Sequence, residues 1–331
     1  MIKTTCLINN FNYADFIIEA VESALGQTVQ FDEVIIVDDA STDNSVEKLQ
    51  ERYAQNPQVK LVIKEKNEGQ LSSFNLGYLA SSGEIICFLD SDDKYQPNYL
   101  ESILKIYNLY PECDFLFCGY EKFKLDSSSS NTISQHQEQI DICQYVRNRG
   151  CSAILTLHTQ RFIGSPTSTL SMRRKIADKI LPFPYLEDWR IRADDCLIYG
   201  ASLVGAVKFS LSLKLVQYRI HTRNNHANKT KEDLKERKEI LVHYQRRLAL
   251  NRLFNSFAQK MNYLDKSELT SFIPFEFKTI PQPDSNDFKK YFNLLWNSNL
   301  KISIKIKSSL IMIKYMLSTR KLSHKIDISG M

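Results

Sequence analysis

Three carboxylates occur within four consecutive residues, at Asp90, Asp92 and Asp93. Charges of one sign this close together repel one another unless a cation neutralises them, and hard divalent cations prefer oxygen ligands of this kind. The acidic run follows a short apolar segment that predicts a buried strand, and open α/β sheets bind their ligands at the carboxyl ends of strands. The pattern therefore indicates a metal or cation site, with a solvated acidic turn that begins a helix as the alternative interpretation.

A second acidic pair, Asp38 and Asp39, ends another apolar run. Parallel strands end at the same edge of their sheet, so we expect the two acidic groups to face one crevice. In that crevice, Asp39 could accept a hydrogen bond from a nucleobase N–H group, and Asp92 could hold a metal on a diphosphate. Asp43, a few residues further on, is better explained as a helix cap.

Short apolar segments alternate with helical patterns over the first hundred residues. Four segments predict strands that are buried on both faces, at 4–8, 33–37, 59–63 and 84–89. The segments between them predict helices, at 15–25, 43–54 and 71–80. Strands and helices in alternation at this spacing predict a parallel α/β sheet with right-handed connections.

The later segments are less regular. Residues 126–137 are polar and serine-rich and predict a loop or insertion, 190–202 predict a helix, and 207–215 predict a half-buried strand. Beyond about residue 229, leucines recur every seven residues in a charged background, which predicts a long amphipathic helix. Residues 300–322 are apolar but carry several lysines; the first part alternates like a strand and the second part could be a helix, so both structures remain open.

The composition is that of a globular protein, because 43% of the 331 residues are hydrophobic and 24% are charged. The seven cysteines are odd in number and include no CxxC pair. This argues against a disulfide framework or a structural zinc site and favours reduced thiols in the cytoplasm. We expect no signal peptide and no transmembrane helix, because no apolar run approaches the roughly 20 residues that span a bilayer.

Charge is divided unevenly along the chain. Residues 1–225 hold 23 Lys and Arg against 28 Asp and Glu, a net −5, whereas residues 226–331 hold 20 against 10, a net +10. The basic part has two interpretations: a helical appendage with solvated lysines, or a peripheral attachment to anionic lipid. Nucleic acid is not an expected partner, because no binding module is recognisable and the front of the chain is acidic.

Several short motifs occur together in a characteristic order. They are Asn12, the run 34–43 (VIIVDDASTD), Asn67-Glu68-Gly69 followed by Asn75 and Gly77, and the run 83–93 (GEIICFLDSDD). Over roughly residues 3–225 this pattern resembles the family 2 glycosyltransferases of GT-A fold. The resemblance implies an α/β, Rossmann-like fold with a mostly parallel central sheet and flanking helices. It also implies a nucleotide-sugar donor, a divalent metal ion (Mn²⁺ or Mg²⁺) and inversion at the anomeric carbon.

Two later motifs extend the resemblance. The pair Asp194-Asp195 resembles the family's late acidic pair, usually Glu-Asp, and the run 218–221 (YRIH) resembles its closing YRxH segment. The second member of the acidic pair is the family's catalytic base, so the resemblance makes Asp195 the base. Because the pair is Asp-Asp here, Asp194 is a rival candidate, and Asp188 of the nearby Glu-Asp pair is a more distant third.

The resemblance carries further roles onto single residues. Those implied to bind the nucleotide sugar are Asn9, Phe11, Asp39, Gln70, Asp90 and Ser91, and those implied to bind the metal are Asp92 and, as a weaker match, His221. Within this set, Phe11 would lie against a uracil ring and Asp39 would read the base. The family's usual Pro-Thr/Ser-Tyr-Asn loop is replaced here by the run 9–12 (NNFN).

Residues 1–225 are therefore expected to form a GT-A glycosyltransferase domain, and residues 226–331 a basic, mainly helical extension. The expected reaction is metal-dependent, inverting transfer of a sugar from a nucleotide-diphosphate donor, a UDP-sugar for preference, to a glycan or lipid-linked acceptor. It would serve polysaccharide or glycoconjugate synthesis in the cytoplasm or at the inner face of the membrane. Two alternatives remain: a non-catalytic sugar-nucleotide-binding or scaffold protein, and a nucleotidyltransferase, although no glycine-rich phosphate loop follows the first strand.

Overall fold

A computed structural model of the chain describes residues 2–124, 141–221, 237–262 and 266–328. The strands are β1 (Thr4–Asn10), β2 (Glu33–Asp38), β3 (Val59–Ile63), β4 (Ile85–Asp90), β5 (Lys94–Tyr95), β6 (Phe115–Lys124), β7 (Val146–Gly150), β8 (Leu170–Arg173) and β9 (Lys208–Ile220). The α-helices are α1 (Ile17–Leu25), α2 (Ser45–Tyr53), α3 (Gln70–Ala80), α4 (Tyr99–Leu109), α5 (Ala153–Thr159), α6 (Arg174–Ile180), α7 (Asp194–Leu203), α8 (Arg237–Lys260), α9 (Lys266–Leu269), α10 (Ile273–Lys278), α11 (Ser285–Trp296) and α12 (Ile302–Ile328). Short 3₁₀ turns include η2 (Thr167–Thr169) and η3 (Leu186–Trp189).

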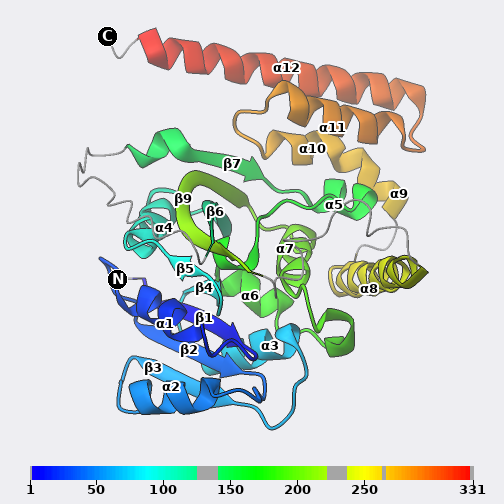
Figure 1. Cartoon of the computed structure of the whole chain (residues 1–331). Helices are drawn as coiled ribbons and strands as arrows, with labels where there is room; N and C mark the ends of the chain where they lie inside the picture. The colour runs from blue at the N-terminus through cyan, green and yellow to red at the C-terminus, as the bar shows by residue number, and fades with distance from the viewer. Residues whose placement is uncertain (1, 125–140, 222–236, 263–265, 329–331) are drawn as a thin grey trace.

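One nine-stranded sheet runs through the protein in the order β3-β2-β1-β4-β8-β6-β9-β5, with β7 paired to β9 (Figure 1). Strands β3, β2, β1 and β4 are mutually parallel, and Cys6 of β1 lies between Val34 of β2 and Cys87 of β4. This confirms the parallel α/β half that the sequence predicts. The expectation that all four strands are buried on both faces is wrong for β3, where Ile63 is 43% exposed, because β3 is the edge strand and pairs only with β2 among the described strands.

The second half of the sheet is mixed. β8 joins the parallel half to β6 by antiparallel pairing on both sides, and β6 then runs parallel to the long β9. The predicted strand at 207–215 is this β9, which continues to Ile220. The helix predicted at 190–202 is α7, which begins only at Asp194. The loop predicted at 126–137 lies outside the described residues.

Helices cover both faces of the sheet. One apolar cluster joins the sheet to α3, α6, α7 and α8, and a second joins it to α1, α2 and α4. The aromatic pair Phe74 and Phe88 belongs to the first, with ring centroids 5.3 Å apart, and the stacked pair Tyr95 and Tyr99 belongs to the second. These two cores hold the carboxyl ends of β1, β2 and β4 in fixed relative positions.

A third apolar cluster lies between α5 and the helices α10, α11 and α12, centred on the fully buried Phe277, Leu295 and Met312. The segment 300–322 is helical from Ile302 onward, which decides between the two structures left open by its sequence pattern. The strand-like alternation at its start is overridden because α12 packs along α10 and α11. Among the described residues, no helix has both the length and the apolar character needed to cross a bilayer.

Candidate active site

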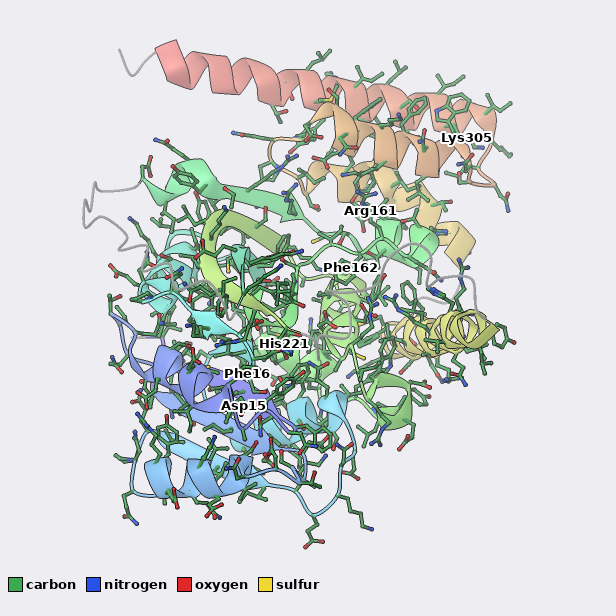
Figure 2. All side chains as sticks on the ribbon, viewed as in Figure 1. Asp15, Phe16, Arg161, Phe162, His221 and Lys305 are labelled. Carbon is green, nitrogen blue, oxygen red and sulfur yellow. The ribbon has the colours of Figure 1, made fainter. Side chains whose placement is uncertain are left out.

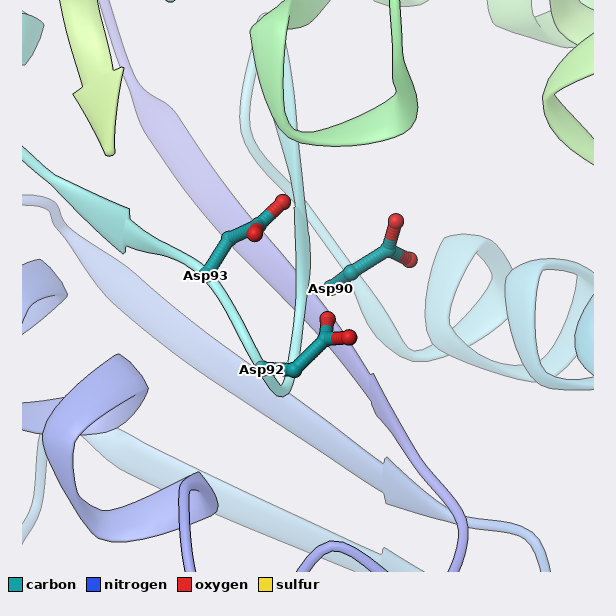
Figure 3. Close-up of side chains that lie close together, drawn as sticks. All are labelled: Asp90, Asp92 and Asp93. Atoms are coloured by element: carbon teal, nitrogen blue, oxygen red, sulfur yellow. The ribbon is translucent and has the colours of Figure 1, made fainter. Parts of the chain in front are cut away.

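Asp90, Asp92 and Asp93 form a cluster at the carboxyl end of β4 (Figure 3). Ligand atoms of the three carboxylates all lie within 4.8 Å of one another. Asp90 ends the strand, Asp92 lies on the turn that follows, and Asp93 leads into β5. Asp93 is 1% exposed, so the cluster is set into the protein and is no ordinary solvated turn.

Two other elements hold this turn in place. The Ser168 hydroxyl of η2 donates to Asp93 Oδ2 at 2.6 Å and accepts from the Asp90 backbone N–H at 3.1 Å. The Arg219 backbone N–H of β9 donates to Asp93 Oδ1 at 2.9 Å, and its side-chain Nε–H donates to the Asp92 carbonyl at 2.8 Å. Asp93 is thus committed to holding the turn, while Asp90 and Asp92 are the members of the cluster that are only partly buried.

The electrostatics of the cluster favour a bound cation. Burial raises the pKa of Asp90 to about 8, and the charges of Asp92 and Asp194 add to this effect. Burial and the charge of Asp92 also raise the pKa of Asp93 well above its usual range. A divalent ion would reverse these shifts because it stabilises the ionised carboxylates. The oxygen-rich donor set fits Mg²⁺ or Mn²⁺.

His221 extends the cluster at the end of β9. Its Nε2 atom lies 3.0 Å from Asp92 Oδ2. The ring packs against two aromatic side chains, with centroid distances of 5.6 Å to Tyr13 and 5.0 Å to Phe16. Figure 2 shows Phe16 and His221 next to each other near the centre of the molecule. The structure therefore brings together the weakest of the metal-site candidates, His221, and the strongest, Asp92.

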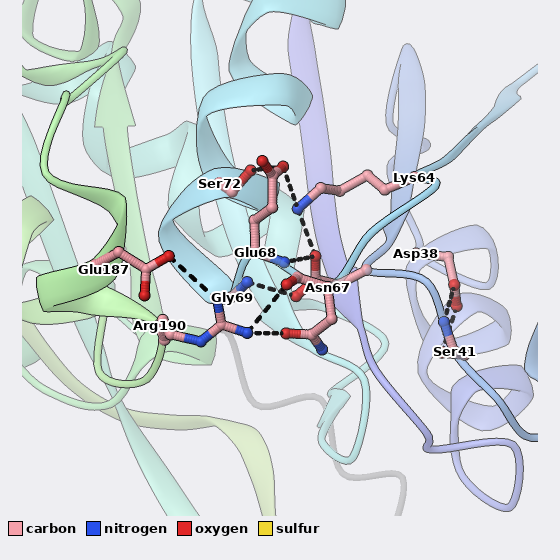
Figure 4. A network of polar contacts seen from close by, with 10 residues as sticks. Asp38, Ser41, Lys64, Asn67, Glu68, Gly69, Ser72, Glu187 and Arg190 are labelled. Carbon is pink, nitrogen blue, oxygen red and sulfur yellow. Dashed lines mark hydrogen bonds and ion pairs between the residues drawn. The ribbon is translucent and has the colours of Figure 1, made fainter.

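Asp39 directly follows β2 and belongs to a network of polar contacts with Lys64, Glu68 and Gly69, which are labelled in Figure 4. Its Oδ1 accepts from the Lys64 ammonium and from the Glu68 backbone N–H at 3.0 Å, and its Oδ2 accepts from the Gly69 N–H at 2.7 Å. A carboxylate oxygen can accept two hydrogen bonds. Within the described contacts Oδ2 therefore keeps capacity for one more donor. The neighbouring Asp38 is fully buried and accepts from the side chains of Asn10 and Ser41, so its role is to shape the loop.

The Asn67-Glu68-Gly69 turn is positioned from a distant part of the chain. Gly69 has a φ of +89°, and a Cβ atom on it would lie 2.3 Å from the Arg190 Cα. The Arg190 guanidinium in turn donates to the carbonyl and the side chain of Asn67. Only glycine fits this contact, which explains the glycine of the motif in physical terms.

Four other predicted donor-site residues lie along the same edge. Gln70 begins α3; its side-chain N–H donates to Asp90 Oδ1 at 3.0 Å and its side-chain carbonyl accepts from the Ala193 N–H at 2.9 Å. Asn9 lies near the carboxyl end of β1, and a hydrogen bond from its side chain lowers the pKa of Asp90 and so favours the ionised carboxylate. Phe11 is 39% exposed on the loop after β1, whereas Ser91 is buried in the turn.

Asp194 and Asp195 both begin α7 but have different surroundings. Asp195 is fully buried, and its Oδ2 pairs with Arg246 of α8 at 2.9 Å and with Arg192 at 3.4 Å. Asp194 is partly exposed and lies close enough for its charge to raise the pKa of Asp90. Burial and the Asp195 charge raise the pKa of Asp194 to about 6. Of the two, Asp194 is therefore the residue whose charge affects the pKa of Asp90.

The third candidate base is engaged elsewhere. Asp188 accepts two hydrogen bonds from the guanidinium of Arg252 on α8. Asp43, expected as a helix cap, accepts from the Ser45 N–H at 3.0 Å, while the residue directly before α2 is Asn44. The closing motif, residues 218–221, lies wholly within the described part of the chain, and the residues that follow it up to 236 do not.

Several supporting residues carry no signal in the sequence. Lys64 neutralises Asp39, Ser168 fixes the acidic turn, and Arg246 pairs with Asp195. Each lies far along the chain from the residue that it supports, so spacing alone could not reveal it. Arg219 could have been found, because it belongs to the YRxH motif.

Comparison with known proteins agrees with this geometry. The family model for glycosyl transferase family 2 matches residues 5–180. The chain belongs to glycosyltransferase family 2. The family match covers the strands that carry Asp39 and the acidic cluster and ends before α7. The resemblance inferred from the motifs is thereby confirmed, and the protein is a glycosyltransferase by family.

Two curated relatives show how far the similarity extends. An uncharacterized glycosyltransferase, alr2836, of Nostoc sp. (strain PCC 7120) is 32% identical over 231 residues, which cover 68% of this chain and 67% of that protein. The putative teichuronic acid biosynthesis glycosyltransferase TuaG of Bacillus subtilis is 30% identical over 148 residues, 44% of this chain and 58% of TuaG. Polysaccharide biosynthesis is thus represented among its relatives.

The solved structures agree on the fold. The crystal structure of S. aureus TarS 1-349 in complex with UDP-GlcNAc has a TM-score of 0.51 and 18% sequence identity, and the match covers 96% of this chain and 92% of that one. The likeness extends through the C-terminal helices. The predicted fold class, a GT-A α/β domain followed by C-terminal helices, is confirmed.

Proposed function

We propose that this family 2 glycosyltransferase transfers a sugar, with inversion, from a UDP-sugar to a glycan or lipid-linked acceptor during cell-surface polysaccharide synthesis. The observation that carries the proposal is the meeting of three parts at one sheet edge. These are the acidic cluster after β4, Asp39 after β2, and Asp194 at the start of α7. We further propose that residues 1–225 form the transferase domain and residues 226–331 the helical extension.

The relatives support the donor and the product class. TuaG is named for teichuronic acid biosynthesis, and a Pasteurella multocida hyaluronan synthase is 41% identical over 142 residues, although the match covers only 14% of that protein. The TarS structure of similar fold holds UDP-GlcNAc. A UDP-sugar donor is the hypothesis most consistent with these names.

The nucleotide would bind at the ends of β1 and β2. Phe11 offers an exposed aromatic ring for stacking on a pyrimidine, and Asp39 Oδ2 offers an acceptor for an imide N–H. Lys64 keeps the Asp39 carboxylate oriented, since both side chains are 5% exposed and form an ion pair. Asn9, Gln70, Asp90 and Ser91 complete the proposed nucleotide-sugar set.

Asp92, with His221 as its neighbour, would hold a divalent ion together with the donor diphosphate. When bound, such an ion would supply neutralisation of the charge that develops on the leaving diphosphate. The protein's own contribution is positional: Ser168 and Arg219 fix the turn that presents Asp92. The Gln70 amide links Asp90 to the backbone at the start of α7, so the end of β4 and the start of α7 are held at a fixed distance from each other.

We propose Asp194 as the general base, in preference to Asp195. The acceptor hydroxyl attacks the anomeric carbon from the face opposite the diphosphate, the bond to the diphosphate oxygen breaks, and the hydroxyl proton passes to an Asp194 carboxylate oxygen. A pKa of about 6 leaves Asp194 mostly ionised at neutral pH yet basic enough to take a proton. Asp195 would instead position α7 through its pairs with Arg246 and Arg192.

The proposed place of action is the cytoplasm at the inner face of the membrane, where a lipid-linked acceptor would be presented. The net charge of +10 over residues 226–331 supports this placement, because anionic lipid attracts basic segments. The surface that would make the contact is described in the next subsection.

Calorimetric titration with UDP, GDP, CDP and dTDP, each with and without Mn²⁺, tests the proposal. We expect metal-dependent binding of UDP, lost in Asp92→Asn and kept in the control Glu51→Gln, whose side chain is exposed on α2. Binding of UDP without turnover of any UDP-sugar would support the non-catalytic alternative. Binding of none of the four nucleotides would contradict the donor site.

A further inference from the structure

Helix α12 lies at the outer edge of the molecule and has two unlike sides (Figure 1). Its inner side packs on α10 and α11, with Met312 fully buried and Ser308 and Ser309 nearly so. This side accounts for the position of the helix. It does not account for the residues on the opposite side.

The outer side of α12 carries a continuous apolar stripe. It consists of five large side chains that are 36–68% exposed: Ile302, Ile306, Leu310, Ile313 and Leu317. Their spacing of three and four residues places them in one row along the helix. Single exposed apolar residues are ordinary on soluble proteins, but a contiguous row of this length marks an interaction surface.

An aromatic residue from a second helix adjoins this row. Trp296, the last residue of α11, is 39% exposed, and its indole N–H donates to the Ser309 hydroxyl at 3.2 Å. Ser309 is one helical turn from both Ile306 and Ile313. Tryptophan is enriched at membrane–water interfaces because it combines an apolar ring with a polar N–H group.

Lysines surround the row. Lys307 and Lys314 are exposed one turn before and after Leu310, and Lys305, labelled in Figure 2, donates to the Trp296 carbonyl at 2.9 Å. Between residues 288 and 326 the sequence contains nine Lys and Arg and no Asp or Glu. A second copy of this chain would bring lysines against lysines, since a two-fold dimer pairs like surfaces. The partner that matches the charge is anionic.

We propose that the outer face of α12, with Trp296, is an interfacial anchor that lies on an anionic lipid bilayer. An amphipathic helix of this kind places its apolar row at the boundary between headgroups and acyl chains, and its lysines among the anionic headgroups. The anchor does not depend on sugar transfer. If the proposed function also holds, the anchor would keep the active site close to a lipid-linked acceptor.

Vesicle flotation tests the anchor with the full-length chain. The probes are vesicles of phosphatidylcholine alone and of phosphatidylcholine with an equal part of phosphatidylglycerol. We expect wild-type protein to float with the anionic vesicles on the order of tenfold more than with the neutral ones, and this preference to shrink as salt is added.

Two sets of substitutions separate the apolar and the charged parts. The triple change Ile306→Ser, Leu310→Ser and Leu317→Ser should reduce binding to anionic vesicles on the order of tenfold or more. The double change Lys307→Glu and Lys314→Glu should reduce binding to anionic vesicles only. Leu109→Ser, an exposed apolar residue at the end of α4, is the matched control and should bind as the wild type does.

Each outcome decides the proposal. Thermal unfolding and UDP binding should be unchanged in the triple variant, which separates loss of the anchor from loss of the fold or of the donor site. Equal flotation of wild-type and triple-variant protein, or no preference for anionic lipid, would overturn the proposal. Loss of a wild-type dimer in the triple variant during sedimentation, without vesicle binding, would replace the membrane by a second copy of the chain.

Discussion

The acidic edge of the sheet and the outer face of α12 depart from the usual sorting of residues in opposite directions. At the sheet edge, the carboxylates of Asp90, Asp92 and Asp93 are partly or fully buried within 4.8 Å of one another, although charged groups of one sign normally stay apart in water. On α12, Leu310 is 61% exposed although leucine is normally buried. Neither arrangement is expected to stabilise the chain by itself, because crowded like charges repel and an exposed leucine gains nothing from burial. Each therefore points to a component outside the chain, a cation with its diphosphate in one case and a lipid surface in the other.

The two regions also differ in how the fold builds them. The acidic site is assembled from β2, β4, η2, α7 and β9, so each carboxylate is fixed by residues from elsewhere in the sequence. The α12 face is produced by the periodicity of one helix. A substitution in the acidic site should therefore impair one specific step, such as metal binding or proton transfer. Substitutions on α12 should instead weaken membrane binding in proportion to the apolar area and the charge that they remove.

The largest effect is expected at Asp92, the carboxylate that we propose binds the metal. Asp92→Asn should lower sugar transfer on the order of 10³-fold or more, because the loss corresponds to several kcal/mol of charge stabilisation at the leaving group. The measurement is initial-rate kinetics with saturating Mn²⁺ and donor. Glu51→Gln should transfer at the wild-type rate, and a variant Asp92→Asn with near-normal activity would remove the acidic cluster from the mechanism.

The next effect separates the two candidate bases. Asp194→Asn should lower kcat by about 10²–10⁴-fold and leave UDP binding intact, because it removes only proton transfer. Asp195→Asn should instead lower the free energy of unfolding by about 1–3 kcal/mol, since it leaves Arg246 without its charged partner. Loss of kcat in Asp195→Asn together with full activity in Asp194→Asn would reverse the two roles.

A smaller effect contrasts the two sides of α12. Met312→Ala should lower the free energy of unfolding by about 2–5 kcal/mol, because it leaves a cavity in the cluster with Phe277 and Leu295. Leu310→Ala, two residues away on the exposed side, should change it by less than about 0.5 kcal/mol. Urea denaturation measures both, and equal losses would mean that the outer face is packed in solution.

The pH dependence of transfer provides a finer test of the base. Asp194 must be ionised to accept a proton, so kcat/KM should fall about tenfold per pH unit below its pKa of about 6 and level off above it. The unfolding transition should be checked over the same range. A rate that stays flat well below pH 6 would show that a different group accepts the proton.

The smallest expected effect lies where α11 meets the sheet. Asp284 caps α11 by accepting from the Asp287 N–H at 2.7 Å, and it pairs with Arg147 of β7 at 2.8 Å. Asp284→Ala should therefore cost about 1 kcal/mol of stability. The backbone contacts of the cap and Arg147 lower the pKa of Asp284 to about 2 against an ordinary 3.8. Its contribution should accordingly be present above about pH 4 and be lost as the pH falls toward 2.

The first half of the fold and the acidic site could be predicted because local pattern and tertiary structure agree there. Asp39 and Asp90 follow continuous apolar runs, and buried parallel strands produce such runs. The choice between Asp194 and Asp195 could not be predicted, because adjacent residues on a helix point in directions about 100° apart. Arg246, whose pairing with Asp195 leads us to favour Asp194, is 51 residues further along the chain than Asp195. The alternation at the start of α12 was ambiguous for a similar reason, since α10 and α11 determine its structure.

A crystal structure with UDP and Mn²⁺, using anomalous scattering to locate the metal, tests the central claim most directly. We expect the ion at Asp92, the uracil near Phe11 with its imide N–H on Asp39, and the Asp194 carboxylate facing the sugar side of the diphosphate while Asp195 remains paired with Arg246. An ion bound away from the cluster, or Asp195 turned into the crevice in place of Asp194, would contradict it.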